Sequence, residues 1–501
     1  MNVLIFTDVN GVIGFGRYAG SYRVATELRK AGYSTQVIEF LADLSLKDIE
    51  SIADKFIDEN TLFVSFSTTL LIKNTDKRSL ERLDRSKQNR YSGHLPQNDE
   101  FVEEMFAVFR RKNQKIKIVL GGGRTDNTSL EGVDYWFWGM SDTSVVALAK
   151  HLKYGEPLKT IDGLVGKVIR AEDYPYHDFD NANIKWEDND YIFENEHLPI
   201  EIARGCIYRC IFCANPLHKK VGEYVRTVDS IREEMLYNYE KFKTTGYMFC
   251  DDTFNDTHKK VKDLHKMITS LPFQIEWTGY GRADVIHAHP EQREMLLETG
   301  LKAILIGIET FGTIASKGVG KGLDPELMKE TLYYIHEAWK GKVVITGSFI
   351  VGLPGESEES IWKTVEWLQR EDCPIDDVMF SPLNIRASTY NPNAPLSKIA
   401  RNPAKYGYTI TGPTLGRGIS TEGPQWENEF MDKNRAETIT RKIQEVFHKE
   451  NPIADWAVYS RLRSIGYSSE ELLNTQKKDI LYDANKKRRD MYHSYMNKLL
   501  S

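Results

Sequence analysis

The chain has 501 residues, a formal net charge of −6 and a hydrophobic content of 41%. This length predicts two or three domains, and the charge shows no basic excess of the kind that indicates nucleic-acid binding. No apolar run approaches the roughly 20 residues of a membrane-spanning helix, and MNVLIFTDVNG at the N-terminus predicts a β-strand rather than a signal peptide. Five cysteines, three of them close together, do not make a disulfide framework and indicate a reducing, cytoplasmic setting.

Residues 1–155 alternate short apolar strands with amphipathic helices. The predicted strands are 3–6, 34–40, 62–67, 115–123 and 134–139. This alternation predicts an α/β fold with a doubly wound parallel sheet, in which ligands bind beyond the carboxyl ends of the strands. The polar stretch 73–100 is too long for an ordinary loop, and we interpret it as either a lid or a disordered insertion.

Residues 156–195 are predicted to form a linker with a short hairpin at 162–171. A second alternation follows over 196–385, with six predicted strands: IEIAR, YMFCDD, QIEWTGY, KAILIGIE, VVITGSFIVG and VMFSPLNI. Six strand–helix units in a row predict a partial (β/α)6 barrel of TIM type, whose active site lies at the C-terminal ends of the strands. Residues 386–501 begin with a Pro/Gly/Asn-rich loop and continue as a mainly helical region.

Three cysteines lie in RGCIYRCIFCANP (204–216), directly after the first of these six strands. Cys206, Cys210 and Cys213 supply one ligand fewer than a closed tetrahedral metal site needs. His218 could complete a structural Cys₃His zinc site. Alternatively, the three thiolates hold a [4Fe–4S] cluster and leave the fourth iron open for a substrate. The spacing alone leaves both interpretations open.

The run Cys206-x-x-x-Cys210-x-Phe212-Cys213 resembles the signature of the radical S-adenosylmethionine (radical SAM) enzymes. Later segments that resemble motifs of that family follow in order at the ends of predicted strands: CDDTF (250–254), GRADVI (281–286), GIE (307–309) and GSFIVGLPGE (347–356). The resemblance implies that the open iron chelates S-adenosylmethionine. One electron from the cluster then splits this cofactor and produces a 5′-deoxyadenosyl radical, which removes a hydrogen atom from the substrate.

The same resemblance implies the S-adenosylmethionine contacts, which are Phe212, Asp251, Asp252, Glu309, Gly347, Ile350 and Gly352. Several of these residues also have a purely structural interpretation. Asp251 could cap the following helix, and Glu309 could form an ion pair with Arg282. The glycines could simply permit close approach of the backbone. Cys250 and Cys373 are predicted to be small buried hydrophobes.

The segment GSYRVATELRKAGYSTQVIEF (20–40) resembles the Rossmann-like cobalamin-binding domain of the family's cobalamin-dependent branch. The resemblance implies that cobalamin lies near Asn10, Ser67, Thr68, Gly121 and Gly122. Asn10 stands where the cobalt-ligating histidine of many such folds would be, so a histidine-ligated cobalt is excluded there. Alternatively, the domain binds nothing and only supports the barrel. The glycines of GFGRYAG (14–20) start too far beyond the strand for a dinucleotide fingerprint.

We therefore expect a radical SAM enzyme with a [4Fe–4S] cluster and cobalamin that methylates an unactivated carbon, or phosphorus, of a small-molecule or peptide substrate. The second hypothesis keeps the radical but uses it for cyclisation, rearrangement or epimerisation without methyl transfer. The third is a non-catalytic or electron-transfer Fe–S protein, which leaves the S-adenosylmethionine motifs unexplained. A tRNA methylthiotransferase is disfavoured, because the sequence shows neither further cluster cysteines nor a basic RNA-binding tail domain. A low-potential electron donor such as flavodoxin or ferredoxin is the expected partner.

Overall fold

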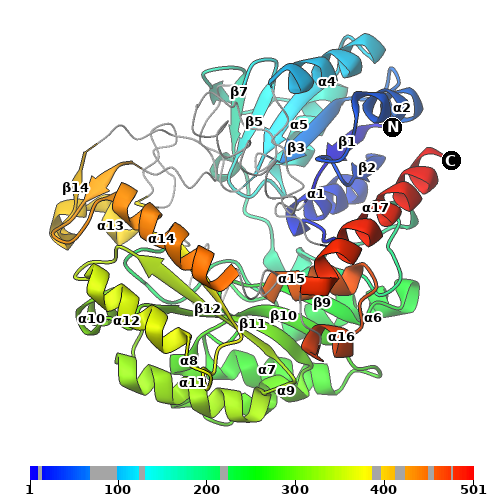
Figure 1. Ribbon diagram of the computed structural model, residues 1–501. Helices are drawn as coiled ribbons and strands as arrows, with labels where there is room; N and C mark the ends of the chain where they lie inside the picture. The colour runs from blue at the N-terminus through cyan, green and yellow to red at the C-terminus, as the bar shows by residue number, and fades with distance from the viewer. Residues whose placement is uncertain are drawn as a thin grey trace. The chain divides into compact units, whose positions relative to one another are not determined.

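The structure is a computed structural model, and it describes residues 1–8, 14–67, 99–122, 130–214, 224–385, 396–411, 424–448, 456–474 and 478–501. Contacts divide the chain into two units (Figure 1). Unit 1 is Met1–Phe193 with Ala484–Ser501, and unit 2 is Glu194–Gly416 with Thr421–Asp483. Among the described helices, none has both the length and the apolar composition needed to cross a membrane. Most of the predicted 73–100 insertion lies outside the described residues.

Unit 1 contains a seven-stranded sheet in the order β2-β1-β3-β4-β5-β7-β6. Its five predicted strands are confirmed as parallel neighbours: β1 (Val3–Phe6), β2 (Thr35–Ile38), β3 (Phe63–Ser67), β4 (Lys117–Gly121) and β5 (Tyr135–Trp138). Strand β2 lies on one side of β1, and β3, β4 and β5 follow on the other side. Because the direction of strand addition reverses, right-handed crossovers place helices on both faces of the sheet. The helices that cover it are α1 (Ala19–Lys30), α2 (Leu46–Phe56), α4 (Asp99–Lys112) and α5 (Ser144–Tyr154). Burial on both faces explains why these strands are mostly aliphatic and aromatic.

The segment 156–195 does more than link two domains. The predicted hairpin is present as β6 (Ile161–Asp162) and β7 (Lys167–Arg170), and β7 extends the sheet by pairing in parallel with β5. Further along, Asp190 forms a two-bond ion pair with Arg29 of α1, with both N–O distances at 2.8 Å. The fully buried Trp186 packs on Tyr22 of the same helix. This segment is therefore an integral part of unit 1.

The last helix, α17 (Lys478–Leu500), contributes its C-terminal part to unit 1. Arg488 pairs with Asp43 at 2.6 Å. The Tyr495 hydroxyl accepts a hydrogen bond from the Glu39 backbone N–H at 3.0 Å, and its fully buried ring packs on Phe40. The residues that follow the edge strand β2 thus receive partners from residues more than 440 positions further along the chain.

Unit 2 contains the six predicted barrel strands, all parallel and in the order β13-β12-β11-β10-β9-β8. Their bounds are β8 (His197–Glu201), β9 (Gly246–Cys250), β10 (Glu276–Gly281), β11 (Leu301–Glu309), β12 (Val344–Val351) and β13 (Asp377–Pro382). No ladder between described residues joins β8 to β13, so the barrel is partial. The helices that alternate with the strands are α6 (Val228–Phe242), α7 (His258–Thr269), α8 (Ala283–Ala288), α9 (Gln292–Glu298), α10 (Thr313–Val319), α11 (Pro325–Trp339) and α12 (Glu358–Leu368).

The rest of unit 2 is mainly helical, as predicted. Its elements are α13 (Lys398–Arg401), β14 (Thr409–Ile410), β15 (Trp426–Glu427), α14 (Lys433–His448), α15 (Trp456–Ser464) and α16 (Ser469–Asn474). Helix α15 lies against the first residues of the barrel strands, where Ser464 accepts a hydrogen bond from the His197 backbone and Arg463 pairs with Glu276 at 2.9 Å. This leaves the opposite, C-terminal ends of the strands for the candidate site.

Candidate active site at the C-terminal ends of the barrel strands

All three clustered cysteines lie on the loop that follows β8, and each carries a thiol rather than a disulfide. Arg204 begins this loop with a two-bond ion pair to Glu201, the last residue of β8, at 2.7 and 2.9 Å. The Cys213 backbone N–H donates to the Cys210 carbonyl at 3.3 Å, which closes a turn between these two cysteines. The chain geometry therefore brings the three thiols to one end of the barrel. His218, the alternative zinc ligand, lies outside the described residues.

A short helix from the C-terminal region secures the same loop. In α13, the Lys398 ammonium donates to the Arg209 carbonyl at 2.7 Å. The Ile399 backbone N–H donates to the Ile211 carbonyl at 3.1 Å, and Ile211 is buried. The backbone between Cys206 and Cys213 thus has partners outside the loop itself.

Two of the cysteines form side-chain hydrogen bonds, Cys206 as the donor to Thr253 and Cys210 as the acceptor from Arg282. Cys206 Sγ lies 3.4 Å from the Thr253 hydroxyl oxygen, and Cys210 Sγ lies 3.6 Å from Nη1 of Arg282. Burial raises the pKa of the Cys206 thiol, and the hydrogen bond with Thr253 partly opposes this effect. Donors next to sulfur stabilise a thiolate, which is the form that binds a metal. Three thiols on one loop, one of them facing the N–H donor of Arg282, therefore fit an iron–sulfur cluster.

The CDDTF segment after β9 folds around a buried lysine. Lys260 Nζ lies 2.8 Å from Asp251 and 3.0 Å from Asp256, and both carboxylates are almost fully buried. Burial alone would lower the pKa of Lys260, but the two carboxylates raise it. The Asp251 carboxylate also accepts a hydrogen bond from the Thr253 backbone N–H at 2.9 Å.

Asp251 therefore does not cap the following helix, because Thr257 occupies the N-cap position of α7. It holds the loop that carries Thr253, while Asp252 is exposed at the same turn. The predicted contact of Asp251 and Asp252 with S-adenosylmethionine stays a prediction. Lys260 was not predicted, although its spacing of four residues from Asp256 was a usable signal.

Glu309 ends β11 with a φ of +71°, at a bulge in its pairing with β12. Its ion-pair partner is Lys321 at 2.8 Å, and not Arg282, which pairs with Asp284 two residues away. Both members of the Glu309–Lys321 pair are buried. Lys321 Nζ also lies 6.0 Å from the centre of the Phe212 ring. Glu309, Lys321 and the aromatic residue of the cysteine motif are therefore neighbours.

The GSFIVGLPGE motif begins in β12 and contains two glycines at closely packed positions. A Cβ added at Gly347 would lie 3.0 Å from the Phe349 ring and 3.1 Å from Ile375, on the face of β12 opposite to Ile350. Gly352 has a φ of +94°, and an added Cβ would lie 2.5 Å from Trp426. These glycines serve close packing in this structure, and their contact with adenine stays a prediction.

The same motif ends in a buried carboxylate that sequence reasoning missed. Glu356 accepts hydrogen bonds from the Thr310 hydroxyl at 2.6 Å and from the Gly352 backbone N–H at 2.9 Å. Burial raises its pKa to about 7, against these hydrogen bonds. It also lines a small cavity together with Glu309, Thr310 and Ile350.

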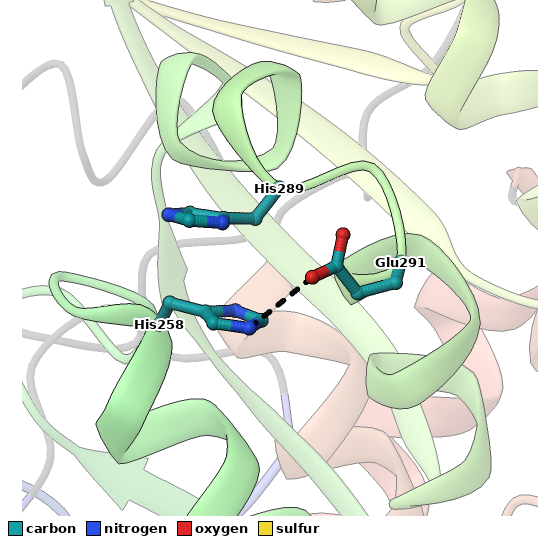
Figure 2. A group of neighbouring side chains, drawn as sticks. All are labelled: His258, His289 and Glu291. Atoms are coloured by element: carbon teal, nitrogen blue, oxygen red, sulfur yellow. Dashed lines mark ion pairs between the residues drawn. The ribbon is translucent and has the colours of Figure 1, made fainter.

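A further polar cluster lies where α7 begins and α9 begins, and Figure 2 shows its three side chains. The rings of His258 and His289 stack with centres 4.1 Å apart, and His258 Nε2 lies 3.2 Å from Glu291. Their ligand atoms are close enough for a metal ion. However, the buried Gln292 has its amide nitrogen 3.3 Å from His258 Nδ1. That hydrogen bond places the ring proton of His258 on Nε2, directed at Glu291, so His258 and Glu291 have polar partners without a metal.

In unit 1, two of the predicted cobalamin residues lie side by side. Ser67 ends β3 and Gly121 ends β4, and these residues are paired in the ladder. Gly122 follows with a φ of +149°. Asn10 and Thr68 lie outside the described residues. The sheet edge that the sequence predicts for the cofactor is therefore formed, and cobalamin contact at these residues stays a prediction.

Comparisons with known proteins agree with the motifs. Residues 200–368 match the Radical SAM superfamily. An uncharacterized methyltransferase of Pyrococcus horikoshii is 26% identical over 179 residues, which cover 36% of this chain and 38% of that protein. The ribosomal protein uS12 methylthiotransferase RimO of Caldicellulosiruptor saccharolyticus is 29% identical over 187 residues, covering 34% and 40%. The chain thus spans about two fifths of the length of these relatives.

Two solved structures match the chain almost end to end. Both are of the radical S-adenosylmethionine methyltransferase TsrM from Kitasatospora setae, at 15% identity. The one with tryptophan substrate and an S-adenosylmethionine analogue has a TM-score of 0.64 and covers 97% of this chain and 99% of TsrM. The one with cobalamin and a [4Fe–4S] cluster has a TM-score of 0.61 and covers 97% and 100%. The fold is shared over both units, and the match to the Radical SAM superfamily lies within unit 2.

Proposed function

We propose that the protein is a cobalamin-dependent radical SAM methyltransferase that acts on an unactivated carbon, or phosphorus, of a small-molecule or peptide substrate. When bound, the cluster, S-adenosylmethionine and cobalamin supply reductive cleavage of a sulfonium and a transferable methyl group. The residues of the chain bind and orient these groups. A low-potential flavodoxin or ferredoxin would deliver the electron.

The observation that carries the proposal is the presence of two cofactor-type sheet edges in one chain. In unit 2, the three cysteines follow β8 at the C-terminal end of a parallel sheet. In unit 1, Ser67 and Gly121 meet at the C-terminal ends of adjacent parallel strands. A small hydroxyl residue and glycines at that edge leave room for a nucleotide tail, which is the type of ligand that such edges bind.

In unit 2, the side chains have separable tasks. Arg282 donates to the Cys210 sulfur, Thr253 accepts a hydrogen bond from the Cys206 thiol, and Lys260 holds the loop that presents Thr253. Glu309 and Lys321 place one negative and one positive charge beside Phe212. Such a pair suits a ligand that carries both hydroxyl and carboxylate groups, as S-adenosylmethionine does.

The test is a measurement of cofactor content. The protein is purified anaerobically, reconstituted with iron and sulfide, incubated with hydroxocobalamin and desalted. We expect about four irons and four sulfides per chain, together with about one retained cobalamin. The retained cobalt is then compared with that of Ser67→Tyr, which fills the predicted tail site, and of Ser34→Tyr. Ser34 is an exposed serine that precedes β2 and so lies at the opposite edge of the same sheet.

Selective loss of cobalamin from Ser67→Tyr supports the proposal. Equal retention in both variants contradicts the assigned cobalamin edge, and four irons without any cobalamin contradict the methyltransferase mechanism. Assays with S-adenosylmethionine labelled in its methyl group then separate the hypotheses. Formation of 5′-deoxyadenosine without a methylated product would favour cyclisation, rearrangement or epimerisation.

A further inference from the structure

Arg282 lies directly after β10, and its side chain is buried beside the cysteine loop. Nη1 donates to Cys210 Sγ at 3.6 Å, and the guanidinium carbon lies 3.7 Å from the centre of the Tyr208 ring. Tyr208 itself stands between Cys206 and Cys210 in the chain. The guanidinium therefore contacts both a cysteine ligand and the aromatic residue within the motif.

The rest of the guanidinium is held firmly by other partners. Nε lies 2.9 Å and Nη2 lies 2.6 Å from the two carboxylate oxygens of Asp284. Nη2 also donates to the Gly320 carbonyl at 3.5 Å. A bidentate carboxylate fixes the plane of a guanidinium, and this plane directs the remaining nitrogen at Cys210.

The backbone of Arg282 is fixed as well. Asn255 accepts a hydrogen bond from the Arg282 N–H at 2.8 Å and donates to the Arg282 carbonyl at 2.9 Å. Asn255 in turn donates to Gln292 at 3.3 Å, and Gln292 donates to His258 at 3.3 Å. These hydrogen bonds connect Arg282 to the group of polar side chains in Figure 2. Asn255 and Gln292 are almost completely buried. This chain of amides gives Arg282 one backbone position as well as one side-chain plane.

We propose that Arg282 is a positioning residue that raises the reduction potential of the cluster through its N–H···S hydrogen bond to Cys210. The inference rests on the iron–sulfur cluster of the proposed function, and it adds a specific effect of Arg282 on the reduction potential of that cluster. Reduction adds one electron to the cluster and so increases the negative charge on its thiolate ligands. A fixed donor stabilises that extra charge, and hydrogen bonds to sulfur are among the factors that set such potentials.

The geometry separates the hydrogen bond from a general effect of charge. Asp284 offsets much of the positive charge of Arg282, so the directed N–H is the main contribution at Cys210. A lysine would keep the charge, but its ammonium cannot pair with Asp284 in two bonds and also reach sulfur in the same plane. Arg282→Lys and Arg282→Gln should therefore both weaken the interaction with Cys210.

The experiment is an anaerobic redox titration of reconstituted protein without S-adenosylmethionine, followed by electron paramagnetic resonance of the reduced [4Fe–4S]⁺ signal. Wild type, Arg282→Gln and Arg282→Lys are compared at equal iron and sulfide content. The control is Arg293→Gln. Arg293 also lies over a tyrosine ring, at 3.9 Å from the centre of Tyr334, and also pairs with a neighbouring carboxylate, Glu294, but it contacts no cysteine.

We expect Arg282→Gln to lower the reduced-to-oxidised ratio at a fixed potential about tenfold, which is a negative shift of about 59 mV for one electron. Arg282→Lys should shift in the same direction, and Arg293→Gln should match wild type. A wild-type potential in Arg282→Gln would overturn the inference, as would a wild-type potential in Arg282→Lys, which would show that charge alone acts. Loss of the cluster from both Arg282 variants would also overturn it, since Arg282 would then shape the loop. Absence of a cluster from wild type would instead refute the proposed function.

Discussion

Glu309 and Lys321 form their ion pair in the space that Gly307 leaves free. A Cβ added at Gly307 would lie 2.7 Å from the carboxylate oxygen of Glu309 and 2.7 Å from the ammonium nitrogen of Lys321. The pair has almost no exposure to water. A glycine in the fourth barrel strand thus makes room for a buried pair of opposite charges next to Phe212.

Removing one member of this pair should cost more than removing both. Lys321→Met leaves a buried, uncompensated carboxylate and should lower the free energy of unfolding by about 3 kcal/mol. The double variant Glu309→Gln/Lys321→Met should recover part of this loss. Anaerobic urea unfolding of wild type, Glu309→Gln, Lys321→Met and the double variant gives the coupling energy of the pair. Lys329→Met, in the more exposed Lys329–Glu326 pair, serves as the control and should change stability by less than about 1 kcal/mol. Additive effects of the two buried substitutions would contradict the expected coupling.

Lys260 should be necessary for the loop that supports Cys206. Lys260→Met leaves Asp251 and Asp256 buried together without a cation, which should cost about 3–5 kcal/mol and reduce iron incorporation on reconstitution. The adjacent Lys259 is a close control, because its pair with Asp263 lies on the surface. Lys259→Met should retain wild-type iron content and thermal stability. Equal behaviour of the two variants would show that the buried network does not support the cysteine loop.

The buried Glu356 predicts a specific pH dependence of stability. Because its pKa is raised from 4.5 to about 7 in the folded chain, the folded state holds a proton that the unfolded state releases. The contribution of this bound proton to the stability of the folded state is therefore complete below pH 4.5, and it is lost as the pH rises towards 7. Over this window, Glu356→Gln should gain about 3 kcal/mol relative to wild type. Urea unfolding from pH 4.5 to 8 measures the difference, and a difference that is constant with pH would contradict the assignment. Glu359→Gln, on the surface of α12, should show no such trend.

The cysteines should fall into two groups. Replacement of Cys206, Cys210 or Cys213 by alanine should abolish the brown colour and the iron content after reconstitution, because each supplies one iron ligand. Cys373→Ala should retain both, since this thiol lies outside the loop. Cys250→Ala is a stricter control, because burial raises the pKa of this thiol well above its usual value and disfavours the thiolate. Retention of iron in any one of the three loop variants would contradict the three-ligand arrangement.

The positions of the strands along the chain could be predicted because each strand is a short buried run between helices. The places where prediction was incomplete involve contacts set by tertiary structure. Strand β7 was predicted as part of a short hairpin in a linker, and only its pairing with Trp136 and its neighbours shows that it belongs to the sheet. Arg282 was the ion-pair partner named in the structural alternative for Glu309, but Asp284 is only two residues away and takes Nε and Nη2 of Arg282. Lys321 lies in a loop with no periodic pattern, so nothing in its sequence context indicated burial.

The long return of α17 to unit 1 has a consequence for synthesis and for dissection of the protein. Phe40, Asp43 and the backbone of Glu39 receive partners from residues 488–495, which leave the ribosome after all of unit 2. The first domain to be translated is therefore the last to be completed. A fragment that stops at residue 193 would expose the surfaces that Tyr495 and Arg488 cover, and it would need the final helix, supplied in trans or by circular permutation, to recover the folding of the intact chain.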